Sequence, residues 1–339
     1  MSQLHQLKVN QINNVTEKAV EILFEIPQHL RSEFKFIAGQ YITISTNLNN
    51  EEVRRAYSLC SDPNSGEIAV GVKRVEGGIM STFLTQELKV GDTLDVMTPK
   101  GTFCLTDERK VVGICAGSGI TPILSMIKSN SAVFTLVYGN KTESSSMFLE
   151  EINNMNISKY LTYSREKVDG CLNSRIDKQL LEELSKNESF LNADGYFICG
   201  PGEMIDFVEE FLLEKGVDKT KIHFERFTPI KKIVSDNSSI DDNTETISNV
   251  TVIMDGDEFE YQLSSNGESI LDSAMDAGAD VPFSCKGGVC CTCKAKVIEG
   301  KAIMTENYAL SEEEVAEGFI LTCKSHPATE NIVVDFDEM

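Results

Sequence analysis

The sequence predicts a multi-domain chain with three structured units: an antiparallel six-stranded β-barrel, an α/β unit with a parallel sheet, and a small α+β unit. Three observations lead to this prediction. Residues 1–105 offer short strands, residues 106–232 alternate strands with helices, and an acidic stretch at 233–248 precedes a cysteine-rich unit at 249–339. A chain of 339 residues is long enough for two or three domains.

The first unit is predicted from short apolar runs separated by turns. Strands are expected at Leu7–Ile12, Ala19–Ile26, Tyr41–Thr46, Ala56–Cys60, Ile68–Lys73 and Thr93–Met97. Alternation is clearest in the second of these, where Val20, Ile22 and Phe24 would share one face. One helix fits, at Ile79–Leu88. Six short strands that follow one another in this way favour a closed antiparallel barrel.

From residue 110 onward, buried strands alternate with helices. Strands are expected at 111–116, 134–139, 160–164 and 196–200, with helices between them. After the last strand, apolar residues recur at helical spacing until Gly216, which can end that helix. This alternation indicates a parallel sheet with helices on both faces.

The last unit is expected to be a small mixed fold that can form on its own. A hairpin turns at Asp255-Gly256 between two alternating segments. The elements expected in this unit are strands at Val250–Met254, Phe259–Leu263, Lys294–Glu299, Phe319–Thr322 and Ile332–Phe336, with helices at Ser269–Ala277 and Glu312–Glu317.

The charge of the chain is strongly negative and unevenly spread. The net charge is −22, from 31 basic and 53 acidic residues. Residues 249–339 carry 18 acids and 5 bases, a net −13, and the Ser-, Asn- and Asp-rich stretch 233–248 has the composition of a flexible linker. Such a chain repels nucleic acid and anionic lipid, so neither is an expected partner. No apolar run is long enough to span a membrane and the first residues carry no export signal, so we expect a cytoplasmic protein.

Five of the ten cysteines lie in the last unit, and their spacing needs a chemical explanation. Cys285, Cys290 and Cys293 follow the C-x4-C-x2-C spacing, and Cys323 comes 30 positions later. This is the plant-type [2Fe–2S] pattern, in which two irons take four thiolates. The alternatives are a zinc site, which usually shows two CxxC-type pairs, or inert thiols. Cys291 falls outside the pattern and is expected to be a bystander.

The chain resembles a known family on these and neighbouring residues. SCKGGVCCTC at 284–293 and LTCKSHP at 321–327 resemble the plant-type ferredoxin domain, which implies a β-grasp fold. The preceding 230 residues resemble ferredoxin–NADP reductase modules, and the combination resembles the reductases of bacterial multicomponent oxygenases. Within that family, KGGVCCTCKAKV, NYAL at 307–310 and VVDFD at 333–337 are similar to the reductase subunits of phenylacetyl-CoA epoxidases.

The resemblance implies a flavin site in the first unit. Arg55-Ala56-Tyr57-Ser58 matches the family's R-x-Y-S motif, in which an Arg and a hydroxyl suit a phosphate and a Tyr can cover the isoalloxazine ring. The other residues that fit this site are Val72, Lys73, Gly78, Ser81, Thr82 and the aromatic Phe227. Without the resemblance, Arg55–Ser58 would be read as a plain strand, and Gly77-Gly78 as a turn before a helix cap. Phe227 would be read as part of the packing core.

The resemblance also implies a nicotinamide-nucleotide site in the second unit. Gly117-Ser118-Gly119-Ile120-Thr121-Pro122 resembles the family's G-x-G-x-T-P, and Cys199-Gly200-Pro201 its C-G-P, which would place Thr121 and Cys199 at the hydride-transfer site. Both segments end expected parallel strands, where such sheets bind ligands. Ser164-Arg165, with Lys141, is similar to the pair that grips the 2′-phosphate in NADP-specific members. The alternatives are a tight strand-to-helix turn and an ordinary loop Arg.

Together these assignments predict an NADPH-dependent oxidoreductase in which electrons pass from the nicotinamide to FAD, to the [2Fe–2S] cluster and to an oxygenase. The expected acceptor is a multi-subunit di-iron oxygenase of phenylacetate degradation. A Rieske dioxygenase, an acyl-CoA desaturase or a hybrid-cluster protein stay open as acceptors, as does FMN in place of FAD. A passive electron carrier is the alternative from another class, and the intact Gly117, Thr121 and Cys199 motifs speak against it.

Overall fold

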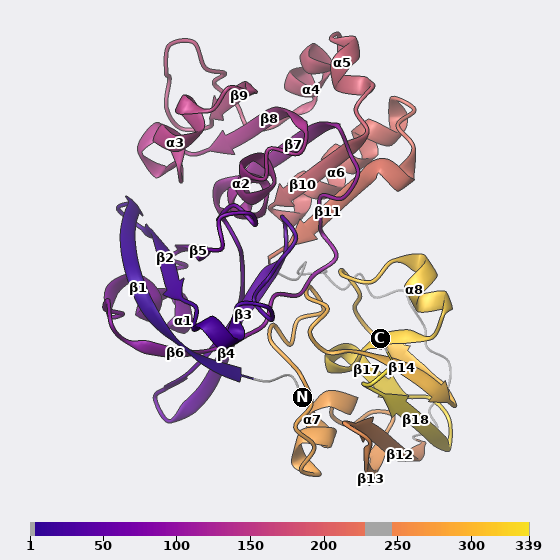
Figure 1. Ribbon diagram of the computed structural model, residues 1–339. Coiled ribbons are helices and arrows are strands. Elements are labelled where there is room, and N and C mark those ends of the chain that lie inside the picture. The colour runs from indigo at the N-terminus through magenta and orange to yellow at the C-terminus, as the bar shows by residue number, and fades with distance from the viewer. Residues whose placement is uncertain (1–3, 228–245, 339) are drawn as a thin grey trace. The chain divides into compact units, whose positions relative to one another are not determined.

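The computed structural model describes residues 4–227 and 246–338. The chain divides into two compact units, Leu4–Phe227 and the C-terminal unit of residues 246–338, which are described separately (Figure 1). The expected linker at 233–248 lies outside the described residues up to 245, and its last two positions, 247 and 248, belong to the first strand of the C-terminal unit.

Six antiparallel strands and one helix form the first half of Leu4–Phe227. They are β1 (Leu4–Thr16), β2 (Ala19–Glu25), β3 (Tyr41–Leu48), β4 (Glu51–Ser58), β5 (Ile68–Lys73), α1 (Ile79–Gln86) and β6 (Thr93–Met97). The strand order is β4-β3-β6-β1-β2-β5. A bridge between Leu59 and Val70 brings the two edges together, and the Cys60 N–H donates to the Ala69 carbonyl over 2.9 Å. The prediction of a six-stranded antiparallel barrel is confirmed.

One strand of the barrel begins five residues before its predicted start. The prediction placed it at Ala56–Cys60, whereas β4 runs from Glu51 to Ser58. Asn49 and Asn50 both have positive φ, 58° and 65°, and join β3 to β4 as a two-residue hairpin turn. Such turns need two left-handed residues, which Asn tolerates. The charged run Glu51–Arg55 hid the strand, because it shows no apolar alternation.

A five-stranded, fully parallel sheet forms the second half, in the order β11-β10-β7-β8-β9 (Figure 1). Its strands are β7 (Lys110–Ala116), β8 (Val133–Asn140), β9 (Ser158–Tyr163), β10 (Gly195–Gly200) and β11 (Ile222–Arg226), and its helices are α2 (Ile120–Lys128), α3 (Leu149–Asn154), α4 (Lys178–Ser185), α5 (Glu188–Leu191) and α6 (Gly202–Glu214). Helices α2 and α3 pack between the sheet and the barrel, and α4, α5 and α6 cover the opposite face. The parallel-sheet prediction is confirmed, but β11 was not among the predicted strands.

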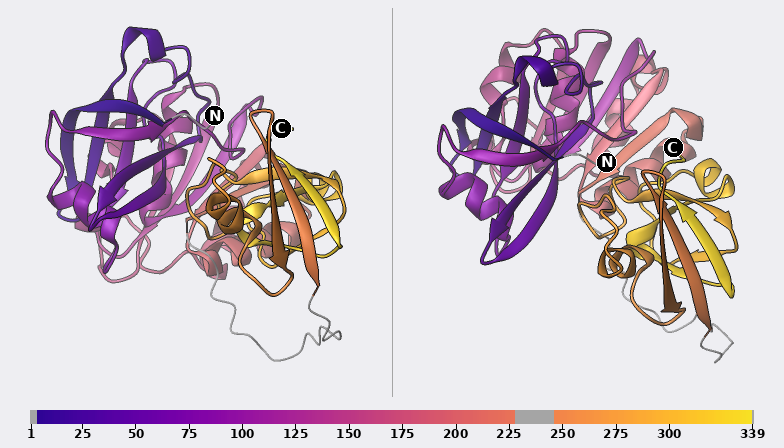
Figure 2. Two further views of the ribbon diagram at one scale, coloured as in Figure 1. Left: turned by 90° about the horizontal axis from the view of Figure 1, so that it is seen from below. Right: turned by 60° about the horizontal axis from the view of Figure 1, so that its bottom comes forward.

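The C-terminal unit is a mixed β-sheet with one helix packed against it. Its strands are β12 (Ile247–Met254), β13 (Asp257–Ser264), β14 (Lys294–Glu299), β15 (Ala302–Met304), β16 (Phe319–Leu321), β17 (Ser325–Pro327) and β18 (Asn331–Asp335), with helices α7 (Ile270–Asp276) and α8 (Glu312–Ala316). The main sheet has the order β13-β12-β18-β14-β16, with β12 and β18 parallel. Helix α7 lies against the sheet (Figure 2). It buries Ile270, Leu271 and Ala274 in the core of this unit. This is the predicted α+β ferredoxin fold.

Candidate functional site: two redox centres and a nucleotide turn

The four predicted cluster cysteines form two pairs at one end of the C-terminal unit. The Cys290 thiol donates to the Cys285 sulfur over 3.0 Å, and a second thiol hydrogen bond joins Cys293 to Cys323. Among the described residues, no three His, Cys, Asp or Glu side chains converge as ligands of one metal ion would. Two pairs of thiolates match two irons with two protein ligands each, rather than one four-coordinate zinc.

Backbone N–H groups of the cysteine loop point at the sulfurs. The Cys290 thiol and the N–H groups of Gly287 and Val289 outweigh burial and lower the pKa of Cys285 to about 5. The Cys293 thiol and the Gly288 N–H likewise lower the pKa of Cys323. Hydrogen bonds to the charged form favour a thiolate, the state in which cysteine binds metal. In each pair the other thiol is the donor: the bond to Cys285 and burial raise the pKa of Cys290, and the bond to Cys323 and burial raise that of Cys293. One thiolate and one thiol thus stand in each pair, and the four sulfurs fit a two-iron cluster that would displace the remaining protons.

The path of this loop is fixed at two positions. Gly288 has φ 71°, and a Cβ there would lie 3.1 Å from the Glu306 carbonyl oxygen. Lys286, also left-handed at φ 48°, donates its ammonium to Asp272 in α7 over 2.7 Å. Cys291 donates instead to the Ala309 carbonyl over 3.6 Å, outside the two pairs.

The predicted flavin residues come from β4, from β5 and from the turn into α1. Arg55 is exposed on β4, while burial raises the pKa of the neighbouring Tyr57. Helix α1 packs against both strands. Its turn is shaped by hydroxyls: Thr82 donates to the Gly78 carbonyl over 2.7 Å, and Ser81 accepts the Val75 N–H over 3.1 Å.

This surface fits a flavin with a phosphate-containing tail. Gly77 has φ 75°, and a Cβ there would meet open space, so its backbone can be approached closely. The apolar side chains of Val75 and Ile79 flank the turn and are 62% and 51% exposed. Val72 and Lys73 end β5 beside it, and Phe227 follows β11 with 39% exposure.

The predicted nucleotide turn is packed directly against the other predicted nucleotide segment. Gly117 is left-handed at φ 58°. A Cβ on Gly119 would lie 2.1 Å from the Cys199 carbonyl oxygen, so no larger residue fits. The next segment, Gly200 and Pro201, leads into α6, and a Cβ on Gly200 would meet Met204 at 2.6 Å. These contacts hold two carboxyl-end loops of the parallel sheet together, where such sheets bind ligands.

Thr121 joins this turn to β5, which we call the flavin strand because it carries Val72 and Lys73 of the predicted flavin site. Its hydroxyl donates to the Ser118 carbonyl over 2.9 Å. Its methyl group lies 2.6 Å from where a Cβ on Gly71 would be. Gly71 belongs to β5, so the barrel and the nucleotide turn meet at these two residues.

Glu225 is a functional candidate that the sequence did not reveal. It lies on β11 opposite Cys199, and its carboxylate accepts the Ser58 hydroxyl over 3.1 Å. Burial raises its pKa to about 8, so the carboxyl can hold or release a proton near neutral pH. Burial, followed by Glu225, raises the pKa of the fully buried Cys199. No sequence signal marked Glu225, because β11 was not predicted and only Phe227 was considered in that segment.

Basic side chains gather at the carboxyl edge of the parallel sheet. The Arg165 N–H donates to the Lys141 carbonyl over 2.9 Å, which places the Ser164-Arg165 loop beside the end of β8. The Lys73 ammonium lies 3.7 Å from the ideal Cβ position of Gly117. Burial, followed by Lys141 and Lys18, lowers the pKa of Lys73. Lys73, Lys141 and Arg165 are cations of the kind that pair with the phosphates of a dinucleotide.

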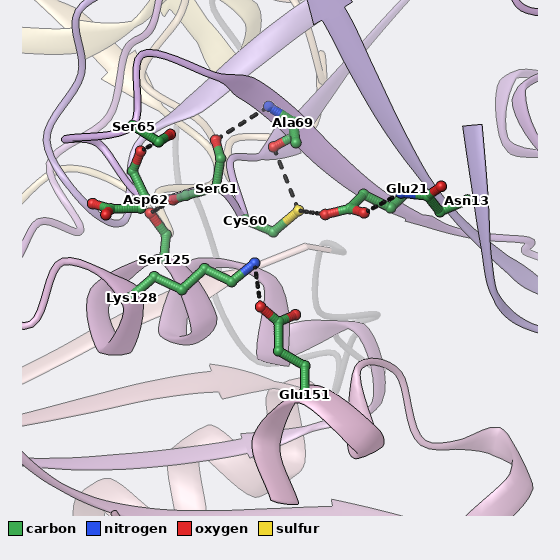
Figure 3. Close-up of polar contacts among 10 residues, drawn as sticks. All are labelled: Asn13, Glu21, Cys60, Ser61, Asp62, Ser65, Ala69, Ser125, Lys128 and Glu151. Carbon is green, nitrogen blue, oxygen red and sulfur yellow. Dashed lines mark hydrogen bonds and ion pairs between the residues drawn. The ribbon is translucent and has the colours of Figure 1, made fainter. Parts of the chain in front are cut away.

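Figure 3 shows polar contacts at the junction of the barrel and the parallel-sheet half, and one buried hydrogen bond there crosses from one half to the other. Ser125 in α2 donates to the Ser61 carbonyl over 2.7 Å. Within the barrel, the single hydrogen of the Cys60 thiol has two acceptors in reach, the Ala69 carbonyl at 3.5 Å and the Glu21 carboxylate at 3.8 Å. Lys128 pairs with Glu151 of α3 over 2.9 Å. Both candidate cofactor surfaces belong to this unit, and the Ser125–Ser61 hydrogen bond is one contact that holds its two halves together.

Comparison with known proteins assigns each region a family. Residues 6–104 match the oxidoreductase FAD-binding domain, residues 114–210 the oxidoreductase NAD-binding domain, and residues 252–328 the 2Fe-2S iron-sulfur cluster binding domain. One of the subunits of 1,2-phenylacetyl-CoA epoxidase from Escherichia coli is 39% identical over 99% of both chains. The ferredoxin reductase component of 3-ketosteroid-9-alpha-monooxygenase from Rhodococcus rhodochrous is 31% identical over 97% of this chain and 96% of its own.

The chain belongs to the family of flavin and iron–sulfur reductase components of oxygenases. It is an oxidoreductase that binds FAD, a nicotinamide nucleotide and a [2Fe–2S] cluster. Phthalate dioxygenase reductase shares the fold over 98% of both chains, with a TM-score of 0.61 and 23% identity. A self-sufficient cytochrome P450 monooxygenase shares it over 98% of this chain and 41% of its own, with a TM-score of 0.73 and 22% identity. Within the described residues, no helix is both long and apolar enough to cross a bilayer.

Proposed function

We propose that this protein oxidises NADPH and delivers the electrons one at a time to the multi-subunit di-iron oxygenase of a phenylacetyl-CoA epoxidase. The similarity to the Escherichia coli epoxidase protein, 39% over the full length, supports this acceptor. The observation that carries the proposal is the occurrence, in one chain, of a nucleotide turn packed on a flavin strand and of two thiol pairs with amide donors. When bound, FAD supplies the conversion of a two-electron hydride donor into one-electron steps for the cluster.

The side chains of the site have separable roles in the proposal. The residues that bind the flavin are Arg55, Tyr57, Ser58, Val72, Lys73, Gly78, Ser81, Thr82 and Phe227. The nicotinamide end of the nucleotide is held by Gly117, Gly119, Thr121, Gly200 and Pro201. Cys199 lies at the point of hydride transfer. Cys285, Cys290, Cys293 and Cys323 ligate the cluster.

Two further residues complete the nucleotide site in the proposal. Ser164 and Arg165 bind the 2′-phosphate, which a guanidinium can grip with two hydrogen bonds. This contact is the basis for proposing NADPH rather than NADH. The abundance of free thiols fits a reducing compartment, and we place the protein in the cytoplasm.

Anaerobic reduction of the purified holoprotein tests the proposal. NADPH should bleach the flavin and then produce the electron paramagnetic resonance signal of a reduced [2Fe–2S] cluster. Adding the oxygenase subunits of a phenylacetyl-CoA epoxidase with phenylacetyl-CoA should then give epoxide, whereas the oxygenase of a 3-ketosteroid 9-alpha-monooxygenase should give no product with its steroid. Cluster reduction without epoxide would leave the relay standing and overturn the acceptor.

A further inference from the structure

A tyrosine hydroxyl connects the nucleotide turn to the segment that supports the flavin strand. Tyr138 lies in β8 with its side chain fully buried. Its hydroxyl oxygen lies 3.1 Å from the Gly117 carbonyl oxygen and accepts the Met147 N–H over 3.0 Å. The Met147 carbonyl oxygen is more distant, at 3.3 Å. A phenol has a single hydrogen to donate, and Gly117 offers the closer acceptor.

The hydroxyl remains a donor at every working pH. Burial raises the pKa of Tyr138 above its ordinary value, so the group stays protonated. The bond falls on the left-handed Gly117, the first residue of the turn that packs through Gly119 on Cys199. Holding the Gly117 carbonyl in place therefore holds the whole turn, and with it the position of Thr121 relative to Cys199.

The other partner of the hydroxyl leads to the barrel. Phe148 follows Met147, is buried, and has a left-handed backbone at φ 59°, which is unusual for a bulky residue. The side chains of Met147 and Phe148 lie 3.2 Å and 3.1 Å from the ideal Cβ position of Gly71 in β5. A strained residue persists where its surroundings demand it, and here it lies against the strand that carries Val72 and Lys73.

We propose that Tyr138 is a positioning residue for hydride transfer: its hydroxyl ties the Gly117 turn to Met147 and Phe148, and so sets the nicotinamide against the flavin strand. This inference rests on the proposed function. It predicts that the hydroxyl matters for the geometry of the reacting pair and not for retention of either redox centre.

The test compares Tyr138→Phe with Tyr196→Phe in the holoprotein. Tyr196 is also fully buried in the parallel sheet, and its hydroxyl donates to the Phe190 carbonyl over 2.7 Å, away from the nucleotide turn. Tyr138→Phe loses the bonds to Gly117 and Met147, and Tyr196→Phe loses those to Phe190 and Ala193, so the two variants are matched, at a cost of about 1–3 kcal/mol in stability for each buried group left without a partner. Flavin and iron content, the thermal midpoint and single-turnover flavin reduction by NADPH in a stopped-flow instrument are measured for both.

We expect Tyr138→Phe to slow flavin reduction by about tenfold or more and to weaken the flavin–NADP⁺ charge-transfer band, because a small displacement of reacting groups has large kinetic effects. Tyr196→Phe should stay within about twofold of the wild-type rate. Equal rates in Tyr138→Phe and wild type, or equal slowing in both variants, would overturn the positioning role alone. Failure of the wild-type flavin to be reduced by either nucleotide would overturn the proposed function as well.

Discussion

Cys285 and Cys323 each receive backbone N–H groups, whereas Cys291 donates its thiol to a carbonyl. This difference separates ligands from a bystander by geometry and not by spacing alone. Replacing Cys285 with Ser should abolish the iron content and the cluster's visible absorption and leave the flavin spectrum intact. The matched control is Cys291→Ser, which should keep full iron. An intact cluster spectrum in the Cys285→Ser protein would contradict the ligand assignment.

Glu225 makes the stability of Leu4–Phe227 depend on pH. Its pKa rises from the ordinary 4.5 to about 8 on burial, so between these values the folded state binds more protons than the unfolded state. Stability must then fall as the pH rises from about 4.5 to 8. In Glu225→Gln, which cannot ionise, the unfolding midpoint followed by flavin fluorescence should fall less between pH 5 and pH 8 than in wild type. Parallel midpoints in the two proteins would show that Glu225 is not the titrating group.

Arg165 carries the proposed choice between the two nicotinamide nucleotides. It is exposed in the loop beside the end of β8, where the proposal places the 2′-phosphate. Arg165→Ala should raise the KM for NADPH by about tenfold or more, since charge-assisted hydrogen bonds contribute about 1.5–3 kcal/mol each. The KM for NADH should change little. Lys167→Ala, two positions away and also exposed, serves as the control, and equal effects on both nucleotides would exclude the role of Arg165.

At the scale of elements, a strand or site was predicted correctly where its residues show a regular spacing, and was missed where only contacts with distant segments define it. The approach of Cys285 to Cys290 and of Cys293 to Cys323 was predictable because metal ligation constrains the spacing of cysteines. Strand β4 was misplaced because its turn is Asn49-Asn50 and its first residues are charged. Strand β11 was missed because a short strand at the edge of a parallel sheet is defined by its pairing with β10, which lies more than twenty residues away. Glu225 was lost with it.

The packing of the nucleotide turn against β10 gives a prediction at the same scale. Gly119 has an ordinary φ of −61°, so Gly119→Ala introduces no backbone strain, only a methyl group 2.1 Å from the Cys199 carbonyl oxygen. The turn must then move away from Cys199, and flavin reduction by NADPH should fall by about a hundredfold. In Gly139→Ala the new methyl meets only side-chain atoms, of Ile176 at 3.2 Å and of Thr162 at 3.6 Å, which can give way more easily than a backbone carbonyl. That variant should reduce its flavin normally, and a normal rate in Gly119→Ala would mean that the close packing has no role in transfer.

At the scale of the whole molecule, the acidic charge is concentrated in the C-terminal unit, which is also the unit with the four cysteines of the cluster pattern. Residues 249–339 hold the four cluster cysteines and carry 18 acids against 5 bases, whereas residues 1–232 carry 31 acids against 26 bases. In the proposal, Lys73, Lys141 and Arg165 lie where the anionic nucleotide binds. The unit with the four cysteines has a net charge of −13, which would favour a basic surface on its acceptor. Complementary charge speeds the encounter of two proteins more than it strengthens their complex.

This division predicts how salt affects the two halves of the reaction. If the acidic cluster unit meets a basic surface of the oxygenase, turnover with the oxygenase should fall by about tenfold between about 50 mM and 500 mM salt, because screening shortens the range of exposed charges. Turnover with a neutral quinone should change by no more than about twofold, since no charged surface guides that encounter. The measurement is NADPH consumption at saturating nucleotide with each acceptor across the salt series. If both acceptors gave the same salt dependence, the effect would lie in the nucleotide half and electrostatic docking would be excluded.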